Sequence, residues 1–375
     1  MGNRSDRDPP SLNASPSLEL LGEMRHGSAK SIRARRLRSA QQAGYKPAAS
    51  SVAHHAKKSL PSGGVHIICM NRILAFSCLV LAMNLIPAHA DTLSSDSPKA
   101  VLVTGASTGI GRMVTERLAA HGYVVYAGAR KDSDLQALGA IKNVHPIRLD
   151  VTKPDDIDAA LKVVMQAGHG LYGLVNNAGI YTEAPVIDTS PEEFDLLMKV
   201  NLYGPYRVTR AFAPLIKAGH GRIVNIGSIS GILNETGAGA YQMSKHAIET
   251  FTATMAQELA PAAVQVSVVE PGSYKSEIVR NTASRSGTLT QKDIDDWAKL
   301  TEPDEVAAAV ELALFEPTPK RRYMVVPSAD QAADTIKAQL EQLVQLNEGQ
   351  RYTYDRATLI KMLDAALKSA RPRAN

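Results

Sequence analysis

Three side chains suited to acid–base chemistry lie in the stretch 228–245, which reads SISGILNETGAGAYQMSK. Tyr241 and Lys245 are four residues apart, so a helix would place them on one face, one turn apart. A phenol ordinarily titrates near pH ~10, and a neighbouring ammonium favours the phenolate, so Lys245 should lower the pKa of Tyr241. Such a phenol can exchange a proton with a substrate oxygen, which the Ser228 hydroxyl could also hydrogen-bond. Because this spacing also occurs on ordinary helix faces, the assignment depends on the surrounding elements.

Two predicted elements would position these groups. Residues 221–227 form a short apolar run typical of a buried strand, which would deliver Ser228 at its carboxyl end. A helix predicted over residues 190–217 contains Asn201, and the Gly-Pro pair just after it should kink the helix. A kink could turn the Asn201 carboxamide inward. The alternative is an exposed asparagine beside a helix defect.

A glycine-rich turn follows the first predicted strand, residues 99–104. Gly105, Gly109 and Gly111 have the spacing G-x-x-x-G-x-G and lead directly into a helical pattern. Glycines there let the backbone approach a pyrophosphate, which the amino end of the helix attracts through its free N–H groups and its dipole. The sequence therefore predicts a dinucleotide-binding turn.

The second predicted strand, residues 123–129, indicates which dinucleotide would bind. A carboxylate at this strand end would bind the ribose diol of NAD, but here Arg130 and Lys131 follow Ala129. Cations suit a 2′-phosphate, so we predict NADP(H) as the cofactor, with NAD possible. The alternative is a solvated charge pair at a helix start.

Further polar or small residues follow other predicted strands. Residues 144–149 precede Asp150 and Val151, and Asp150 is placed to hydrogen-bond an adenine. A strand from Gly173 leads into residues 176–179 (NNAG), a turn that could pass beneath the cofactor or be a plain turn stabilised by asparagine. Since ligands bind at the carboxyl ends of parallel strands, these ends should converge on one site.

These motifs, in this order, resemble the short-chain dehydrogenase/reductase family over residues 99–327, and within it the branch with hydroxysteroid and retinol dehydrogenases. The resemblance implies that Tyr241 is the general acid/base and that Lys245 lowers its pKa and binds the nicotinamide ribose. It implies Ser228 as the donor to the substrate oxygen and Asn201 as the holder of a water linking Lys245 to solvent. Ser276 stands where the family usually has a threonine that contacts the carboxamide. The candidate cofactor-binding residues are Gly105, Ser107, Thr108, Gly109, Ile110, Gly111, Arg130, Asp150, Val151, Asn177, Ala178, Gly179, Tyr241, Lys245, Pro271, Gly272 and Ser276.

The predicted fold is α/β, a Rossmann-like doubly wound parallel sheet of about seven strands over residues 99–327. Residues 328–375 form a C-terminal helical extension to this single domain, with helical patterns at 328–346 and 356–369. Residues 277–300 are polar and rich in Ser and Thr, which predicts a mobile lid over the substrate; the alternative is a surface insertion.

The leader differs in composition from the rest of the chain. Residues 1–90 hold 12 Lys and Arg against 4 Asp and Glu, whereas residues 91–375 hold 30 against 33. Because residues 91–375 have a net charge close to zero, the sequence argues against nucleic acid as a partner. The same residues contain no cysteine for a disulfide or a thiolate metal site, so no metal is predicted.

Within the leader, residues 1–69 are predicted to be disordered or to lie upstream of the true start. Residues 70–90 combine a basic start, an apolar run and Ala-His-Ala, as in a signal peptide; the alternative is an uncleaved membrane anchor or a buried helix. The protein would be exported, for instance to the periplasm, if this signal is used, and cytoplasmic otherwise.

The expected function is NADP(H)-dependent interconversion of an alcohol and a ketone or aldehyde by hydride transfer. Two alternatives stay open: an isomerase or dehydratase with tightly held nicotinamide, and a non-catalytic NADP-binding scaffold. The resemblance implies a homodimer or homotetramer that pairs through the helices holding Asn201 and Tyr241. The expected partners are otherwise a small alcohol or carbonyl substrate and no membrane beyond the leader.

Overall fold

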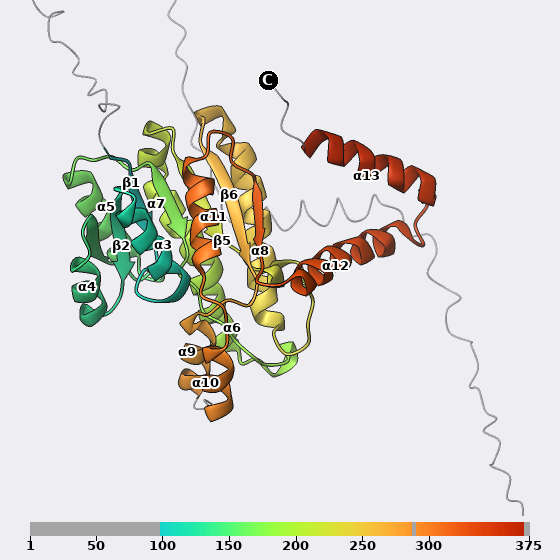
Figure 1. Ribbon diagram of the computed structural model, residues 1–375, viewed down its shortest axis with the longest axis horizontal. Coiled ribbons are helices and arrows are strands. Elements are labelled where there is room, and N and C mark those ends of the chain that lie inside the picture. Colours follow the sequence, from blue (N-terminus) through green and yellow to red (C-terminus); the bar gives the residue numbers. More distant parts are fainter. Residues whose placement is uncertain (1–97, 287–289, 371–375) are drawn as a thin grey trace, which may run out of the picture. The chain divides into compact units, whose positions relative to one another are not determined.

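The computed structural model describes residues 98–286 and 290–370, so the predictions for the leader, including the signal peptide at 70–90, lie outside it. One parallel sheet carries seven strands in the order β3-β2-β1-β4-β5-β6-β7 (Figure 1). The strands are β1 Ala100–Val103, β2 Val124–Ala129, β3 Val144–Arg148, β4 Gly173–Asn176, β5 Arg222–Ile226, β6 Gln265–Pro271 and β7 Arg322–Val325. The predicted doubly wound Rossmann-like fold is confirmed.

Strands β1, β2 and β4 are buried on both faces because successive side chains alternate between two hydrophobic layers. In β1, Val101 and Val103 join the layer with helices α3 and α11, whereas Ala100 and Leu102 join the layer with α5 and α7. The helices between strands are α3 Gly109–Ala120, α4 Asp132–Gly139, α5 Pro154–Gln166, α6 Pro191–Met198, α7 Gly204–Ala218, α8 Gly239–Glu258 and α11 Asp304–Phe315. The short helical turns are η1 Val186–Asp188, η2 Lys199–Tyr203, η3 Ile229–Gly231 and η4 Ala260–Ala262.

The helix predicted over 190–217 is interrupted next to the Gly-Pro pair, close to where the sequence predicted a kink. It begins as expected, with the Ser190 side chain accepting a hydrogen bond from the Glu193 N–H. The irregularity is the π-helical turn η2, which contains Asn201, and α7 then starts at Gly204 with proline tolerated in its first turn. The sequence therefore located the irregularity of the helix within a few residues.

Two further segments carry the remaining helices. Residues 277–300, predicted as a lid, contain helices α9 Glu277–Ser286 and α10 Gln291–Ala298. The C-terminal extension contains α12 Ala329–Asn347 and α13 Arg356–Ala370, close to the predicted bounds. Among the described residues, no helix is both long enough and apolar enough to cross a membrane.

Candidate active site

The predicted acid–base residues meet at the carboxyl edge of the sheet, between β5 and helix α8. Ser228 is the second residue after β5 and caps the short turn η3, its Oγ accepting from the Ser230 N–H at 3.1 Å. Tyr241 and Lys245 occupy successive turns of α8 and are buried, with 9% and 5% exposure. The Lys245 ammonium lies 5.6 Å from the centre of the Tyr241 ring and donates to the Ile226 carbonyl at 2.9 Å.

Burial dominates the electrostatics of this pair. It raises the pKa of Tyr241 to about 12, although a hydrogen bond from Ser228 acts in the opposite direction. The expectation that Lys245 would bring the pKa of the phenol toward neutral pH is therefore wrong. Burial also lowers the pKa of Lys245 to about 8, because an ammonium in an apolar site is costly. The phenol is protonated at neutral pH, the form that can donate to a carbonyl oxygen.

The Asn201 side chain points inward, which agrees with the first of the two alternatives predicted from the sequence and not with an exposed asparagine. Its side chain is 2% exposed. Its Oδ1 accepts from the Ile180 N–H at 2.8 Å, and its Nδ2 donates to the Ile180 carbonyl and to Ser244 Oγ at 2.9 and 3.0 Å. These bonds join the π-helical turn to α8 and to the loop after β4. The carboxamide is thus a structural link, and its water-holding role stays a prediction.

The glycine turn is held by the loop after β4. Gly105 and Gly109 have φ of +66° and +53°, a left-handed region that favours glycine. Asn177 Nδ2 donates to the carbonyls of Thr104 and Gly105 at 2.9 and 3.0 Å. A methyl group at Gly105 would lie 2.8 Å from Ala178 Cα. The NNAG segment therefore supports the turn from below, which explains why both motifs carry small residues.

The amino end of α3 is open to an anion. Its N-cap Thr108 makes no side-chain capping bond, and its first turn holds no acidic residue. The Gly105–Gly111 turn and this helix end therefore offer uncompensated N–H groups and a favourable dipole. These features fit a dinucleotide pyrophosphate.

The end of β2 is positively charged. Arg130 forms no ion pair within the part of the chain that the structure describes. The nearest following carboxylate, Asp132, pairs with Arg148, which also donates to the Arg130 carbonyl at 2.6 Å. The sequence analysis did not identify Arg148. The pairing of strands β2 and β3 would have revealed it, because Arg148 ends β3 directly beside Ala129, the last residue of β2.

Asp150 lies at the end of β3, as predicted. Its Oδ1 accepts from the backbone and hydroxyl of Thr152 at 2.9 and 2.7 Å. Burial alone would raise the pKa of Asp150, but these bonds and the charges of Arg130 and Lys153 outweigh it and lower the pKa. Val151 is buried and packs against Gly204, and Gly179 lies beside Asn201.

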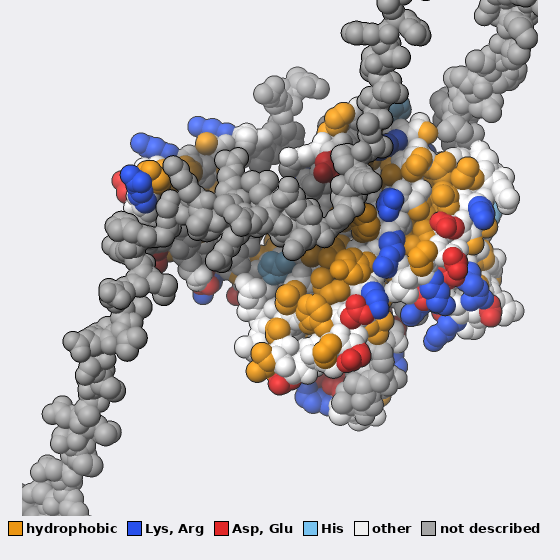
Figure 2. Space-filling view, turned by 180° about the vertical axis from the view of Figure 1, so that it is seen from behind, with side chains coloured by type: hydrophobic (Ala, Val, Ile, Leu, Met, Phe, Trp, Pro, Cys, Tyr) orange, Lys and Arg blue, Asp and Glu red, His pale blue; other side chains and the backbone are white. Residues whose placement is uncertain are grey.

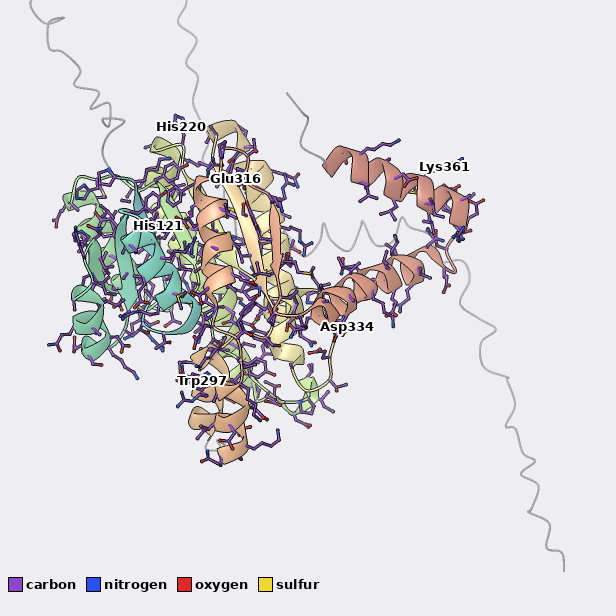
Figure 3. The ribbon with its side chains drawn as sticks, in the orientation of Figure 1. His121, His220, Trp297, Glu316, Asp334 and Lys361 are labelled. Carbon is purple, nitrogen blue, oxygen red and sulfur yellow. The ribbon has the colours of Figure 1, made fainter. Side chains whose placement is uncertain are left out.

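The 277–300 segment covers the same edge of the sheet. Figure 3 shows Trp297 at the end of the molecule opposite His220, which precedes β5. The Trp297 Nε1–H donates to the Ser276 carbonyl at 2.9 Å, and Ser276 lies against Gly109. Gly272, after β6, donates to the Val325 carbonyl at 2.8 Å and is crowded by Gln331. Ser276 therefore lies against the glycine turn, whereas the described contacts of Gly272 are with Val325 and Gln331, and the cofactor-binding roles of Pro271, Gly272 and Ser276 stay predictions.

An apolar group surrounds the Tyr241 phenol. Tyr181, from the loop after β4, makes an edge contact with the Tyr241 ring at 4.9 Å between ring centres. Ile278, from the 277–300 segment, packs against the same group. Thr282 Oγ1 donates to the Tyr181 carbonyl at 2.6 Å, which ties the segment to this loop. Sequence reasoning named neither Tyr181 nor Ile278.

Comparison with known proteins places the chain in a family. Residues 99–287 match the family model "short chain dehydrogenase". The chain therefore belongs to the short-chain dehydrogenase family, as the motifs indicated.

The similar curated proteins have several substrates in their names. The chain is 37% identical over 196 residues to a mitochondrial D-beta-hydroxybutyrate dehydrogenase of Bos taurus, covering 50% of this chain and 57% of that protein. It is 36% identical to retinol dehydrogenase 5 of Mus musculus, covering 53% and 63%. It is 34% identical to the 3-oxoacyl-(acyl-carrier-protein) reductase FabG of Vibrio cholerae, covering 60% and 92%. The chain thus spans well under the full length of the first two relatives.

Solved structures agree with this assignment. A short-chain dehydrogenase from Streptomyces avermitilis superposes with a TM-score of 0.57 at 29% identity, covering 69% of this chain and all (100%) of that one. A 3-ketoacyl-(acyl-carrier-protein) reductase from Brucella melitensis, complexed with NADH, gives 0.55 at 25% identity, covering 62% and 98%.

Gly111→Ala tests the packing of the glycine turn. A methyl group there would collide with the Gly105 carbonyl oxygen and the Asn177 amide nitrogen. We expect a loss of about 2–4 kcal/mol in the free energy of unfolding, together with weaker nucleotide binding. Gly139→Ala in α4, where the nearest atom would be at an ordinary 3.4 Å, is the matched control. Equal stability of the two variants in denaturant titrations would contradict this packing.

Proposed function

We propose that the protein is an NADP(H)-dependent oxidoreductase that interconverts an alcohol and a ketone or aldehyde. The observation that carries the proposal is the junction of Ser228, Tyr241 and Lys245 at the carboxyl edge of the sheet, beside the glycine turn. When bound, the nicotinamide would supply or accept the hydride. The residues of the chain would bind the dinucleotide, orient the substrate oxygen and exchange its proton.

In the reduction direction, Tyr241 acts as the general acid. Ser228 donates a hydrogen bond to the carbonyl oxygen and holds it within reach of the phenol, which gives up its proton as negative charge develops on that oxygen. The Lys245 ammonium stabilises the phenolate that results. In the oxidation direction the same groups act in reverse, with the phenolate as base.

The positive end of β2 supports NADP(H) rather than NAD(H). Arg130 is exposed and free to meet a 2′-phosphate, and Arg148 engages Asp132, the carboxylate that could otherwise repel that phosphate. Asp150 and Val151 would flank the adenine. Gly105, Gly109 and the amino end of α3 would hold the pyrophosphate.

We also propose that the protein forms a homodimer or homotetramer. Figure 2 shows hydrophobic side chains gathered in patches on the back of the molecule. Helices α6 to α8 and the turn η2 expose Leu196, Tyr203, Tyr206 and Met243, each by 40–49%. Exposed apolar side chains on neighbouring elements favour association. Light scattering of the purified protein should give a multiple of the 40.2 kDa chain mass, and a monomer at micromolar concentration would contradict the proposal.

Tyr241→Phe tests the reaction. The substitution removes the hydroxyl with little change in shape, so we expect turnover of carbonyl substrates to fall by about 100-fold or more while NADPH affinity changes less than about two-fold. Tyr206→Phe on α7, at an exposed tyrosine, should leave both unchanged. Near-normal turnover of the Tyr241→Phe variant excludes Tyr241 as the acid/base.

Arg130→Ser tests the cofactor preference. Loss of a charge-assisted bond to the 2′-phosphate should weaken NADPH binding by about ten-fold or more and leave NADH binding within about two-fold. Lys142→Ser, an exposed cation at the opposite end of the sheet, is the control. Fluorescence titration of the full chain with each nucleotide measures both affinities. Equal or tighter NADH binding by the wild type would refute the preference.

A further inference from the structure

A third ionisable residue continues the row of Tyr241 and Lys245 along α8. Glu249 lies one helical turn beyond Lys245, so the three side chains occupy one face of the helix. Its side chain is only 15% exposed. A carboxylate is rarely buried without a reason, and the proposed reaction has not used this one.

Glu249 belongs to a charge cluster, which consists of Lys245, Glu249, Glu270 and Arg322; the Arg322 side chain is 48% exposed and forms its edge toward solvent. Arg322 Nη2 lies 3.2 Å from Glu249 Oε2. The same guanidinium binds both oxygens of Glu270, which is 1% exposed, with its Nε at 3.2 Å. One arginine thus serves two carboxylates. The second positive charge of the cluster is the ammonium of Lys245.

The ionisable groups around Glu249 come from three elements of the fold. Lys245 lies on α8, Glu270 on β6 and Arg322 on β7. Burial and the charge of Glu270 raise the pKa of Glu249 to about 7, against the opposing effects of Arg322 and Lys245. In return, the charge of Glu249 raises the pKa of Lys245 against the effect of burial.

Glu249 also lies against the turn that carries Ser228. A methyl group on Gly227 would lie 2.8 Å from Glu249 Oε1, and one on Gly231 would lie 3.3 Å from Glu249 Cγ. Gly227 immediately precedes Ser228, and Gly231 closes η3. Glu249 Oε1 is itself buried without a hydrogen-bond partner among the described residues. The carboxyl group therefore fills the space between the helix of Lys245 and the turn of Ser228.

We propose that Glu249 is a positioning residue for the reaction: its carboxylate keeps Lys245 protonated, and its side chain supports the turn that presents Ser228. This inference rests on the proposed oxidoreductase function. Arg322 and Glu270 hold the carboxylate in place, and Lys245 transmits its charge to the Tyr241 phenol.

The dependence of kcat/KM on pH tests the electrostatic part. Glu249→Gln removes a negative charge at nearly constant shape, which lowers the pKa of Lys245 and of the Tyr241 phenol together. The alkaline limb of the pH profile of kcat/KM for carbonyl reduction should therefore move to lower pH by about one unit. A shift of this size is expected when one charge a helical turn away is removed. Glu258→Gln, the same change at an exposed site on α8, should leave the limb in place. Glu249→Asp should give an intermediate position.

Thermal unfolding of the full chain gives a readout independent of activity. The raised pKa of Glu249 means that its ionisation opposes folding, so its stabilising effect is present at low pH and lost as pH rises toward about 7. The melting temperature of Glu249→Gln relative to the wild type should therefore increase between pH 5 and pH 8.

The possible outcomes separate this inference from the proposed function. An active Glu249→Gln variant with an unmoved alkaline limb overturns the inference and leaves the oxidoreductase intact. A wild type that neither binds NADPH nor reduces any carbonyl overturns the proposed function. If the wild type or the Glu249→Gln variant is inactive, the melting temperatures of the two proteins decide. A difference between these temperatures that does not change with pH overturns the proposed role of the charge cluster. If Glu249→Gln does not fold, Glu249→Asp takes its place, and an unmoved limb then overturns the inference.

Discussion

The hydrogen bond from the Lys245 ammonium to the Ile226 carbonyl is, with the one from Asn225 to Thr252, one of the links between strand β5 and helix α8, and it lies next to the candidate site. It fixes helix α8 to the end of strand β5, and Ser228 is the second residue after that strand. Burying an ammonium is unfavourable, so the position requires a strong acceptor and nearby negative charge. The carbonyl supplies the first and Glu249 the second. The register of Tyr241 against Ser228 depends on this bond.

The turn proposed to bind the nucleotide lies at the same carboxyl edge of the sheet as that junction. Asn177 holds the glycine turn through two backbone carbonyls, and Asn201 holds the loop after β4 through both atoms of its carboxamide. Each asparagine replaces hydrogen bonds that irregular backbone cannot make with itself. The turn, the loop and the π-helical segment are therefore one connected support. Small residues are needed at their contacts because backbone atoms meet there.

The sequence predicted most of the fold because its strands are apolar runs bounded by clear turn signals. Local motifs also located Ser228, Tyr241, Lys245 and the glycine turn, since each lies next to the element that positions it. Three features depended on pairing across distant segments. Arg148 reaches Asp132 through strand register, Arg322 joins Glu249 to Glu270 from the last strand, and burial outweighs the Ser228 hydrogen bond in setting the pKa of Tyr241. No spacing along the chain reports such contacts.

The acid–base groups and the apolar wall beside them belong to different parts of the chain. Tyr241, Lys245 and Glu249 share one rigid helix, whereas Ile278 and Thr282 come from the separate 277–300 segment, whose described contacts with the site are few. Exchange of that segment would alter the surface that a substrate meets without disturbing the proton donor. A fold organised in this way can acquire new substrates through changes in one insertion, which gives a physical reason why relatives with similar sheets have such different substrates in their names.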